Sequence, residues 1–153
     1  MQPRWSEREI TELVSSRVSG RWPRDPKAYQ EAHFAACHAS RRDAYFGLMN
    51  VCPSAPNQLG PQKLAGKLLC GVYPHAFEDV EPLVVRLLPC WNVSASDFPR
   101  YCVRRFGRLR ALKVLYELEA KALPERDRAA LGSFLFWVSK FRDRPNPSIE
   151  RTA

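Results

Sequence analysis

Histidine and cysteine side chains can share a metal ion when they lie one helical turn apart, and this sequence contains one such pair. His33 and Cys37 are four residues apart, and His38 follows directly. Protein sites for zinc use three or four ligands, and no CxxC or HxxxH pattern completes the set. We therefore expect ordinary packing and surface residues here, with no metal site and no cofactor.

The other groups that could do catalysis give no clearer signal. Glu78, Asp79 and Glu81 gather where a helix is expected to begin, and the helix dipole favours negative charge there without any catalytic purpose. His75 falls in a turn, and Cys102 falls in an apolar stripe where a nucleophile would be buried. No phosphate-binding glycine loop, nucleophile elbow or Cys/His signature occurs. We assign no catalytic residue, and an enzyme with an unrecognised site stays an alternative.

Positive charge is the remaining feature. The stretch RYCVRRFGRLRALK, residues 100–113, holds six Arg or Lys residues and no acid, in a chain of net charge +8. Such a surface attracts nucleic acid or another acidic partner. An Arg excess over Lys of 18 to 6 is also explained by base composition and solubility. The candidate binding residues form a predicted ridge: Arg100, Arg104, Arg108, Arg110 and Lys113.

Aromatic residues decide how this stretch is oriented. Phe98, Tyr101, Cys102 and Phe106 recur at the spacing of one buried helical face. Burying a Phe or Tyr stabilises by roughly 1.5 to 3 kcal/mol, which exceeds the local contribution of an exposed arginine. The aromatic rings should therefore face the core, where they cannot stack on bases.

Arg105 is an exception to this pattern because it falls inside the apolar stripe. A charge in that position needs an acidic partner or an extended path to solvent. We expect Asp79 or Asp127 to be the partner, or the side chain to reach water.

The composition and the positions of helix-capping and helix-breaking residues predict an all-α fold. Ile and Thr occur only twice each, so residues that favour strands are scarce. Ser6, Asp25, Ser40 and Ser96 are predicted N-caps, and Gly107 is predicted to separate two helices. The expected helices are 7–18, one from 26, 41–52, 60–73, 78–90, 97–106, 108–122 and 124–141. We expect these segments to form a fold of about seven or more helices packed as antiparallel pairs.

The domain organisation is predicted from the loops. Residues 53–60, PSAPNQLG, form the longest expected loop and the place where the chain could divide into halves. After residue 142 the apolar period ends. The prediction is one helical domain over 1–142, with a possible subdivision at 53–60, and a flexible tail over 143–153.

The segment after Gly107 is apolar over most of its circumference. Leu109, Leu112, Leu115 and Tyr116 cover one side, and a second apolar side adjoins it. A helix of this kind is expected to be flanked on two sides, as in the middle of a stack.

A weak internal repeat supports a stack. A shift of 30 residues aligns 83–88 with 113–118, and within these segments it matches Val84 with Val114, Val85 with Leu115 and Leu88 with Leu118. The same shift aligns the partner helices, with Asp97 on Asp127, Tyr101 on Leu131 and Phe106 on Phe136. A helix pair that recurs in this way is typical of an α-solenoid. Residues 80–140 resemble HEAT-like repeats, which implies stacked antiparallel helix pairs. A helical bundle is the alternative, because the period is shorter than is usual in that family.

The last ten residues, RPNPSIERTA, carry a separate resemblance. They are similar to the read-through peptide of bacterial integron gene cassettes. The resemblance implies a mobile bacterial accessory gene.

Cysteine usage and the apolar profile bear on location. The five cysteines are odd in number and widely spaced, as expected for reduced thiols. No segment has the length or apolar character of a membrane span or a secretion signal. We therefore expect a cytoplasmic protein that contacts no membrane.

Together these features favour a non-catalytic helical protein whose exposed faces bind a macromolecular partner, most simply another protein. Nucleic-acid binding through the predicted ridge is the second hypothesis, and a small enzyme is the third.

Overall fold

The computed structural model describes residues 4–16 and 26–142, and the regular secondary structure of these residues is helical. The helices are α1 (Glu7–Ser16), α2 (Pro26–Cys37), α3 (Arg41–Met49), α4 (Val51–Ser54), α5 (Leu59–Val72), α6 (Val80–Leu87), α7 (Asp97–Phe106), α8 (Arg108–Glu119) and α9 (Glu125–Lys140). One isolated bridge joins Trp5 and Ala39, and the described residues contain no strand. The all-α prediction is confirmed. None of the described helices is both long and apolar enough to cross a bilayer.

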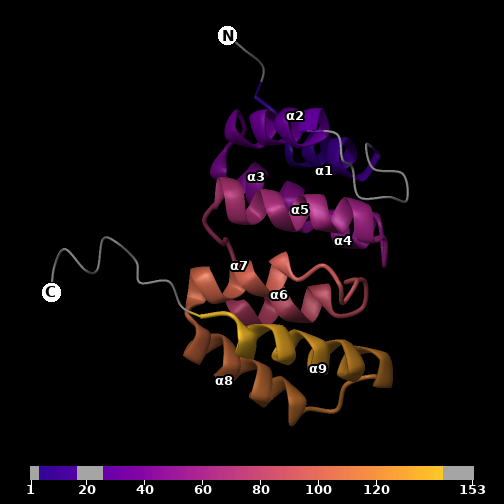
Figure 1. Ribbon diagram of the computed structural model, residues 1–153, viewed down its shortest axis with the longest axis vertical. Coiled ribbons are helices and arrows are strands. Elements are labelled where there is room, and N and C mark those ends of the chain that lie inside the picture. Colours follow the sequence, from indigo (N-terminus) through magenta and orange to yellow (C-terminus); the bar gives the residue numbers. More distant parts are fainter. Residues whose placement is uncertain (1–3, 17–25, 143–153) are drawn as a thin grey trace, which may run out of the picture.

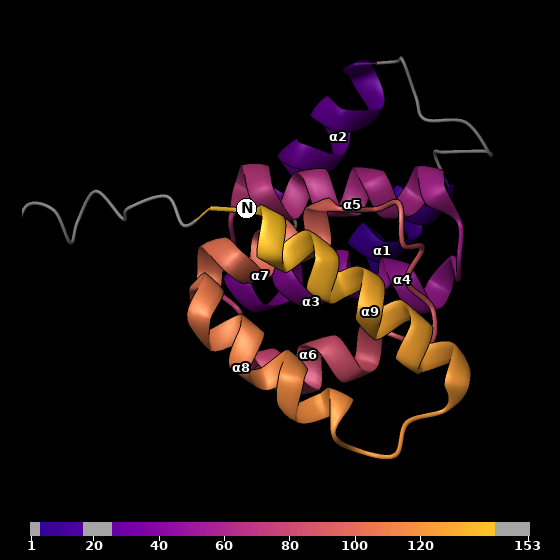
Figure 2. The same ribbon diagram turned by 60° about the horizontal axis from the view of Figure 1, so that its bottom comes forward.

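The helices stack in layers along the long axis of the molecule (Figure 1). In one row, α2 packs on α5, α5 on α7, and α7 on α9. In a second row, α1 packs on α3, and α6 packs on α8. The rotated view places α8 and α9 side by side in the last layer (Figure 2), where they pack directly on each other. Helix pairing is thus the organising feature, and α8 lies at the end of the stack.

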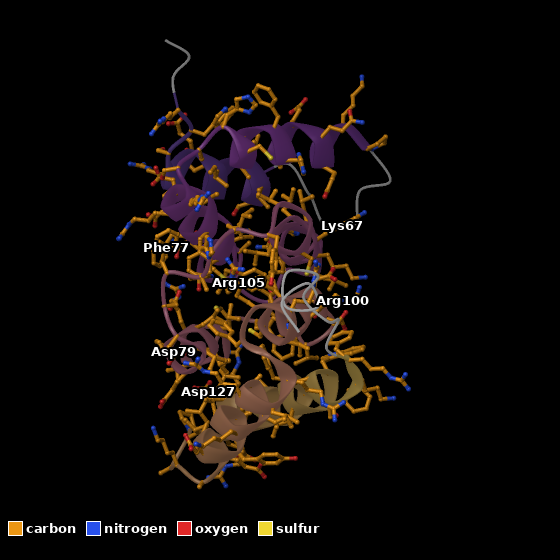
Figure 3. All side chains as sticks on the ribbon, turned by 90° about the vertical axis from the view of Figure 1, so that its left-hand side faces the viewer. Lys67, Phe77, Asp79, Arg100, Arg105 and Asp127 are labelled. Atoms are coloured by element: carbon orange, nitrogen blue, oxygen red, sulfur yellow. The ribbon has the colours of Figure 1, made fainter. Side chains whose placement is uncertain are left out.

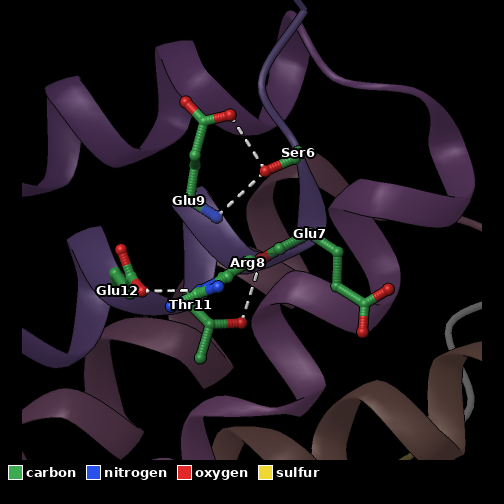
Figure 4. Close-up of polar contacts among 6 residues, drawn as sticks. All are labelled: Ser6, Glu7, Arg8, Glu9, Thr11 and Glu12. Atoms are coloured by element: carbon green, nitrogen blue, oxygen red, sulfur yellow. Dashed lines mark hydrogen bonds and ion pairs between the residues drawn. The ribbon is translucent and has the colours of Figure 1, made fainter.

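Local sequence signals set several helix ends. The Ser6 hydroxyl accepts from the Glu9 amide at 3.2 Å and donates to the Glu9 carboxylate at 2.9 Å (Figure 4). Ser40 and Asp43 repeat this arrangement before α3. Gly107, at φ 87°, separates α7 from α8 in a conformation that strains any side chain. These predicted starts and the predicted break are confirmed, whereas Asp25 and residues 17–18 lie outside the described residues.

Other predicted ends are wrong. Ser96 makes no side-chain cap, because its backbone is already helical (φ −71°, ψ −11°). The third helix ends at Met49, and Pro53 does not stop the chain but lies within α4, close enough to its start that no helical amide is lost. The predicted loop also shortens, since α5 begins at Leu59. The helix predicted over 78–90 spans only Val80–Leu87.

The core runs through all layers and is rich in aromatic residues. Tyr45, Phe98, Tyr101 and Phe134 are fully buried, and Trp91 packs edge-on against Phe134 at 5.1 Å between ring centroids. Phe98 and Tyr101 therefore face inward as the stripe predicted. Phe106 is only half-buried at the end of α7.

A buried glutamine holds two loops together across the predicted 53–60 division. Gln62 has no exposed surface, and its amide donates to the carbonyls of Ala55 and Cys90 at 3.1 and 2.8 Å. Its own oxygen accepts from the Asn92 amide at 2.7 Å. The loop before α5 is therefore joined to the loop after α6 through one side chain.

Candidate binding surfaces

The predicted ridge begins on α7, where Arg100 and Arg104 lie close to other helices. The Arg100 guanidinium lies 4.7 Å from the centroid of the Phe141 ring, just after α9. Arg104 donates to the Cys70 carbonyl on α5 at 3.1 Å and lies 4.9 Å from the centroid of the Tyr73 ring. These two arginines therefore lie on the side of the stack formed by the row of α5, α7 and α9.

The rest of the predicted ridge points elsewhere. Arg110 pairs with Asp79 at 2.7 Å, at the start of α6, while Arg108 is half-buried and Lys113 is exposed on the outer side of α8. In Figure 3, Arg100 lies on one side of the molecule and Asp79 on the other. The structure thus divides the five candidate residues into two groups.

Arg105 does not use either of the carboxylates that the sequence indicated. It contacts the His75 ring nitrogen and lies 4.6 Å from the centroid of the Tyr73 ring. Asp79 is occupied by Arg110, and within the described residues no carboxylate forms an ion pair with Arg105. An aromatic face and an imidazole replace the expected acid, so the predicted ion pair is wrong. The side chain is partly exposed, which agrees with the alternative that it reaches water.

A hollow with arginine walls lies between α5, α7 and the end of α9. Its volume is about 370 Å³, and we call it the arginine hollow; its lining residues are Cys70, Arg100, Val103, Arg104, Phe141 and Arg142. Val103 is buried and Phe141 half-buried, so the hollow combines apolar surface with three cationic groups. The sequence indicated two of the three arginines but not Arg142, which lay beside the predicted tail.

The outer α8 face, formed by Leu109, Lys113 and Tyr116, is exposed. Leu109 is 78% exposed and Tyr116 is 60% exposed. The prediction that α8 is flanked on two sides is wrong, because α8 ends the stack and buries only the opposite side of the helix, with Leu115 at its centre. Two large apolar side chains therefore face solvent on the same side of α8, two turns apart.

The opposite end of the stack also has an apolar depression. A hollow of about 390 Å³ between α1 and α2 is lined by Trp5, Leu13, Gln30, Glu31 and Phe34. Phe34 is 52% exposed. Both ends of the helix stack therefore carry exposed aromatic surface.

The histidine and cysteine pair shows ordinary local contacts. The Cys37 sulfur lies 3.6 Å from the His33 Nδ1 atom, and the His38 ring stacks on Phe34 at 3.9 Å between centroids. In the described part of the chain no three His, Cys, Asp or Glu side chains gather as metal ligands.

Two of the clustered acids, Glu78 and Asp79, contact residues of other helices. Glu78 accepts from the Tyr45 hydroxyl at 2.7 Å and pairs with Arg86. Asp79 accepts from the Val80 amide at 2.8 Å, and this bond together with Arg110 lowers the pKa of the Asp79 carboxyl. Each carboxylate thus has a structural partner, and the buried Tyr45 hydroxyl was not indicated by the sequence.

The cysteines are all free thiols. Burial raises the pKa of the Cys102 thiol well above its ordinary value, and Cys102 has no exposed surface. A protonated and inaccessible thiol cannot act as a nucleophile.

Comparisons with known proteins identify no relative. No protein-family model matches the chain, and neither the curated proteins nor the solved structures include a significant match. The arrangement of the side chains is therefore the basis for the functional proposal.

Proposed function

We propose that this protein is a non-catalytic helical scaffold that binds a protein partner through the outer α8 face. The observation that carries the proposal is the exposure of Leu109 and Tyr116 at the last layer of the stack. Terminal units of helical stacks normally present a polar outer face to remain soluble. A terminal helix with large apolar residues pointing outward is typical of an interaction site.

Burial of these side chains would supply useful binding energy. Covering one Leu or Tyr side chain contributes roughly 1.5 to 3 kcal/mol, and aromatic residues are frequent among the residues that dominate interfaces. Leu109 and Tyr116 lie seven residues apart, so they occupy the same side of α8 two turns apart. This spacing fits the apolar side of a second helix.

The charge on the same face describes the partner further. Lys113 lies between Leu109 and Tyr116 along α8 and is exposed. A partner helix that covers the two apolar residues would place a group opposite this ammonium, where an acidic side chain is favoured. We therefore expect an amphipathic helix with a carboxylate beside its apolar stripe.

The stacked pairs and the free thiols support two further parts of the proposal. The row α2, α5, α7 and α9 is what a HEAT-like α-solenoid would present, although the 30-residue alignment places exposed Val85 on buried Leu115. Five free cysteines suit a reducing compartment, and we place the protein in the cytoplasm.

Nucleic-acid binding is less well supported. Arg110 is paired with Asp79, and Arg100 and Arg104 lie apart from it, so the five candidate residues do not form one continuous cationic track. Tyr101 is buried and cannot stack on a base. We expect any DNA or RNA binding to be lost at physiological salt; retained micromolar affinity that Arg100→Glu with Arg104→Glu abolishes would favour the nucleic-acid hypothesis instead.

Paired affinity purification from the native host tests the proposal. The wild-type protein is compared with the double variant Leu109→Glu, Tyr116→Glu, and co-purifying proteins are identified by mass spectrometry. We expect at least one protein to be recovered with the wild type and lost with the variant, because a buried carboxylate opposes docking.

A matched double variant controls for added negative charge. Ala122 and Ala129 are exposed outside the outer α8 face, and both are replaced by Glu. This control should recover the same proteins as the wild type. Recovery of identical proteins with all three forms would refute the assignment of the docking face.

A further inference from the structure

The arginine hollow is separate from the outer α8 face and has a chemistry of its own. Its walls bring α7, α5 and the end of α9 together, and it is a built concavity of about 370 Å³. Sites for small organic ligands fall within this size range. A ligand here would contact three successive helices of one row.

The guanidinium groups in the hollow retain hydrogen-bonding capacity. Arg104 donates one hydrogen bond, to the Cys70 carbonyl, although a guanidinium carries five N–H donors. The Arg100 Nε atom lies 3.9 Å from the Asp97 carboxylate, which is too long for a hydrogen bond. Both groups otherwise lie over aromatic rings, Phe141 and Tyr73 respectively.

The charges in the hollow are not balanced. Arg100, Arg104 and Arg142 bring three positive charges, and Asp97 is the one carboxylate that pairs with any of them among the described residues. Within the described part of the chain, two positive charges therefore remain. A phosphate monoester carries about −1.5 to −2 at neutral pH, whereas a carboxylate or a phosphate diester carries one negative charge.

Cys70 does not add negative charge to the hollow. Burial raises the pKa of the Cys70 thiol to about 11, and this exceeds the opposing effect of Arg104 and Arg100. The thiol donates to the Asp97 carbonyl at 3.4 Å and is neutral near pH 7.

The rest of the lining is apolar. Val103 is almost fully buried, so the half-buried Phe141 ring supplies the exposed apolar wall. An inorganic anion would leave the exposed part of the Phe141 ring uncovered, whereas an aryl or alkyl group would contact it. The lining therefore matches an anion attached to an apolar body.

We propose that the arginine hollow binds a phosphate monoester with an apolar organic part, held by Arg100, Arg104 and Arg142 and packed against Phe141. Guanidinium groups suit this ligand, because their planar forks bind phosphate oxygens in a bidentate manner. The source of the ligand is a free phosphorylated metabolite or a phosphorylated side chain of a protein.

Isothermal titration calorimetry on the full chain tests the proposal with phenyl phosphate as the probe. We expect phenyl phosphate to bind more tightly than inorganic phosphate, which lacks the apolar part, and than benzoate or dimethyl phosphate, which carry one charge. Tighter binding of a short phosphotyrosine peptide than of phenyl phosphate supports a protein source, and equal binding supports a free metabolite. Failure of phenyl phosphate to bind at millimolar concentration, or equal affinity for benzoate, overturns the proposal.

Single substitutions locate the site. Arg100→Gln and Arg104→Gln should each weaken phenyl phosphate binding by about tenfold, the effect of losing one charged hydrogen bond. Arg128→Gln removes the same charge from an exposed position outside the hollow and should leave affinity unchanged. Equal weakening by all three variants would show a diffuse charge effect and refute the site. Thermal melting of each variant confirms that it is folded.

Discussion

At the residue scale, one buried amide joins segments that are far apart along the chain. The nitrogen of the Gln62 side chain donates to the Cys90 carbonyl, and its oxygen accepts from the Asn92 amide. These partners lie 28 and 30 residues from Gln62 along the chain. An apolar residue at this position would leave the Asn92 amide without its acceptor, and the carbonyls of Ala55 and Cys90 would keep only their backbone bonds from Gln58 and Asn57. Such orphaned groups cost more than the hydrogen bonds themselves contribute.

Gln62→Ala should therefore lower the free energy of unfolding by about 2 to 4 kcal/mol, as expected when buried polar groups lose their partners. Urea denaturation followed by circular dichroism measures the change. Gln58→Ala is the control, because Gln58 is exposed and makes no side-chain cap, and it should change stability by less than about 0.5 kcal/mol. Similar losses for both variants would contradict the role of Gln62.

Buried hydroxyls and thiols determine how the fold responds to alkaline pH. Burial raises the pKa of the Tyr45 and Tyr101 hydroxyls above their ordinary value of 10.0. The hydrogen bond to Glu78 raises the pKa of Tyr45 further. Burial also raises the pKa of Cys70 from 9.0 to about 11. As the pH rises, these groups lose their protons in the unfolded chain before they do so in the folded protein. Their contribution to the free energy of unfolding is therefore complete below their ordinary pKa values and decreases as the pH rises above them.

The urea midpoint should therefore be constant near pH 7 and fall as the pH rises through 9 and then 10. Tyr45→Phe removes one of the groups that titrate only on unfolding, so its midpoint should fall less steeply above pH 10 than that of the wild type. A midpoint that rises with pH, or an identical slope in both proteins, would contradict the assignment.

At the element scale, α1 and α3 approach so closely that a side chain has no room between them. A Cβ atom at Gly47 would lie 2.8 Å from the Ile10 Cβ atom and 3.0 Å from the Glu7 carbonyl oxygen. The Gly47 carbonyl also accepts from the Thr11 hydroxyl at 2.8 Å. Gly132 on α9 is the opposite case, since a Cβ atom there would meet nothing within 4 Å.

Gly47→Ala should destabilise the protein by about 1 to 3 kcal/mol, because the two helices must separate. Gly132→Ala should stabilise it by about 0.5 to 1 kcal/mol, because alanine loses less backbone entropy in a helix. Thermal and urea unfolding of the two variants give the comparison. A stabilising Gly47→Ala would show that α1 and α3 are not in close contact.

Much of the element pattern could be predicted from the sequence, because it depends on neighbours along the chain. The caps at Ser6 and Ser40 and the break at Gly107 involve residues within one helical turn, and the structure confirms them. The buried stripe of α7 was predictable for the same reason. Exposure of Leu109 was not, because it depends on which helix ends the stack, and periodicity within α8 carries no information about that.

At the scale of the whole molecule, the same reasoning explains what could be predicted of the candidate sites. Net charge and arginine spacing indicated Arg100 and Arg104, but the hollow also needs Phe141 and Arg142 from the end of a helix far along the chain. Arg110 was assigned to a ridge, yet the fold brings Asp79 to it. Contacts between layers therefore decide which charges are left for a ligand.

The proposed function requires that a partner protein docks on the outer α8 face at the end of the stack. Site-specific photo-crosslinking measures this directly, with a photoreactive phenylalanine analogue in place of Tyr116 and, as the control, in place of Ala129. The account predicts a crosslinked protein adduct in native cells from position 116, absent at position 129 and lost when Leu109→Glu is added. Equal adducts at both positions, or an adduct that survives Leu109→Glu, would contradict it.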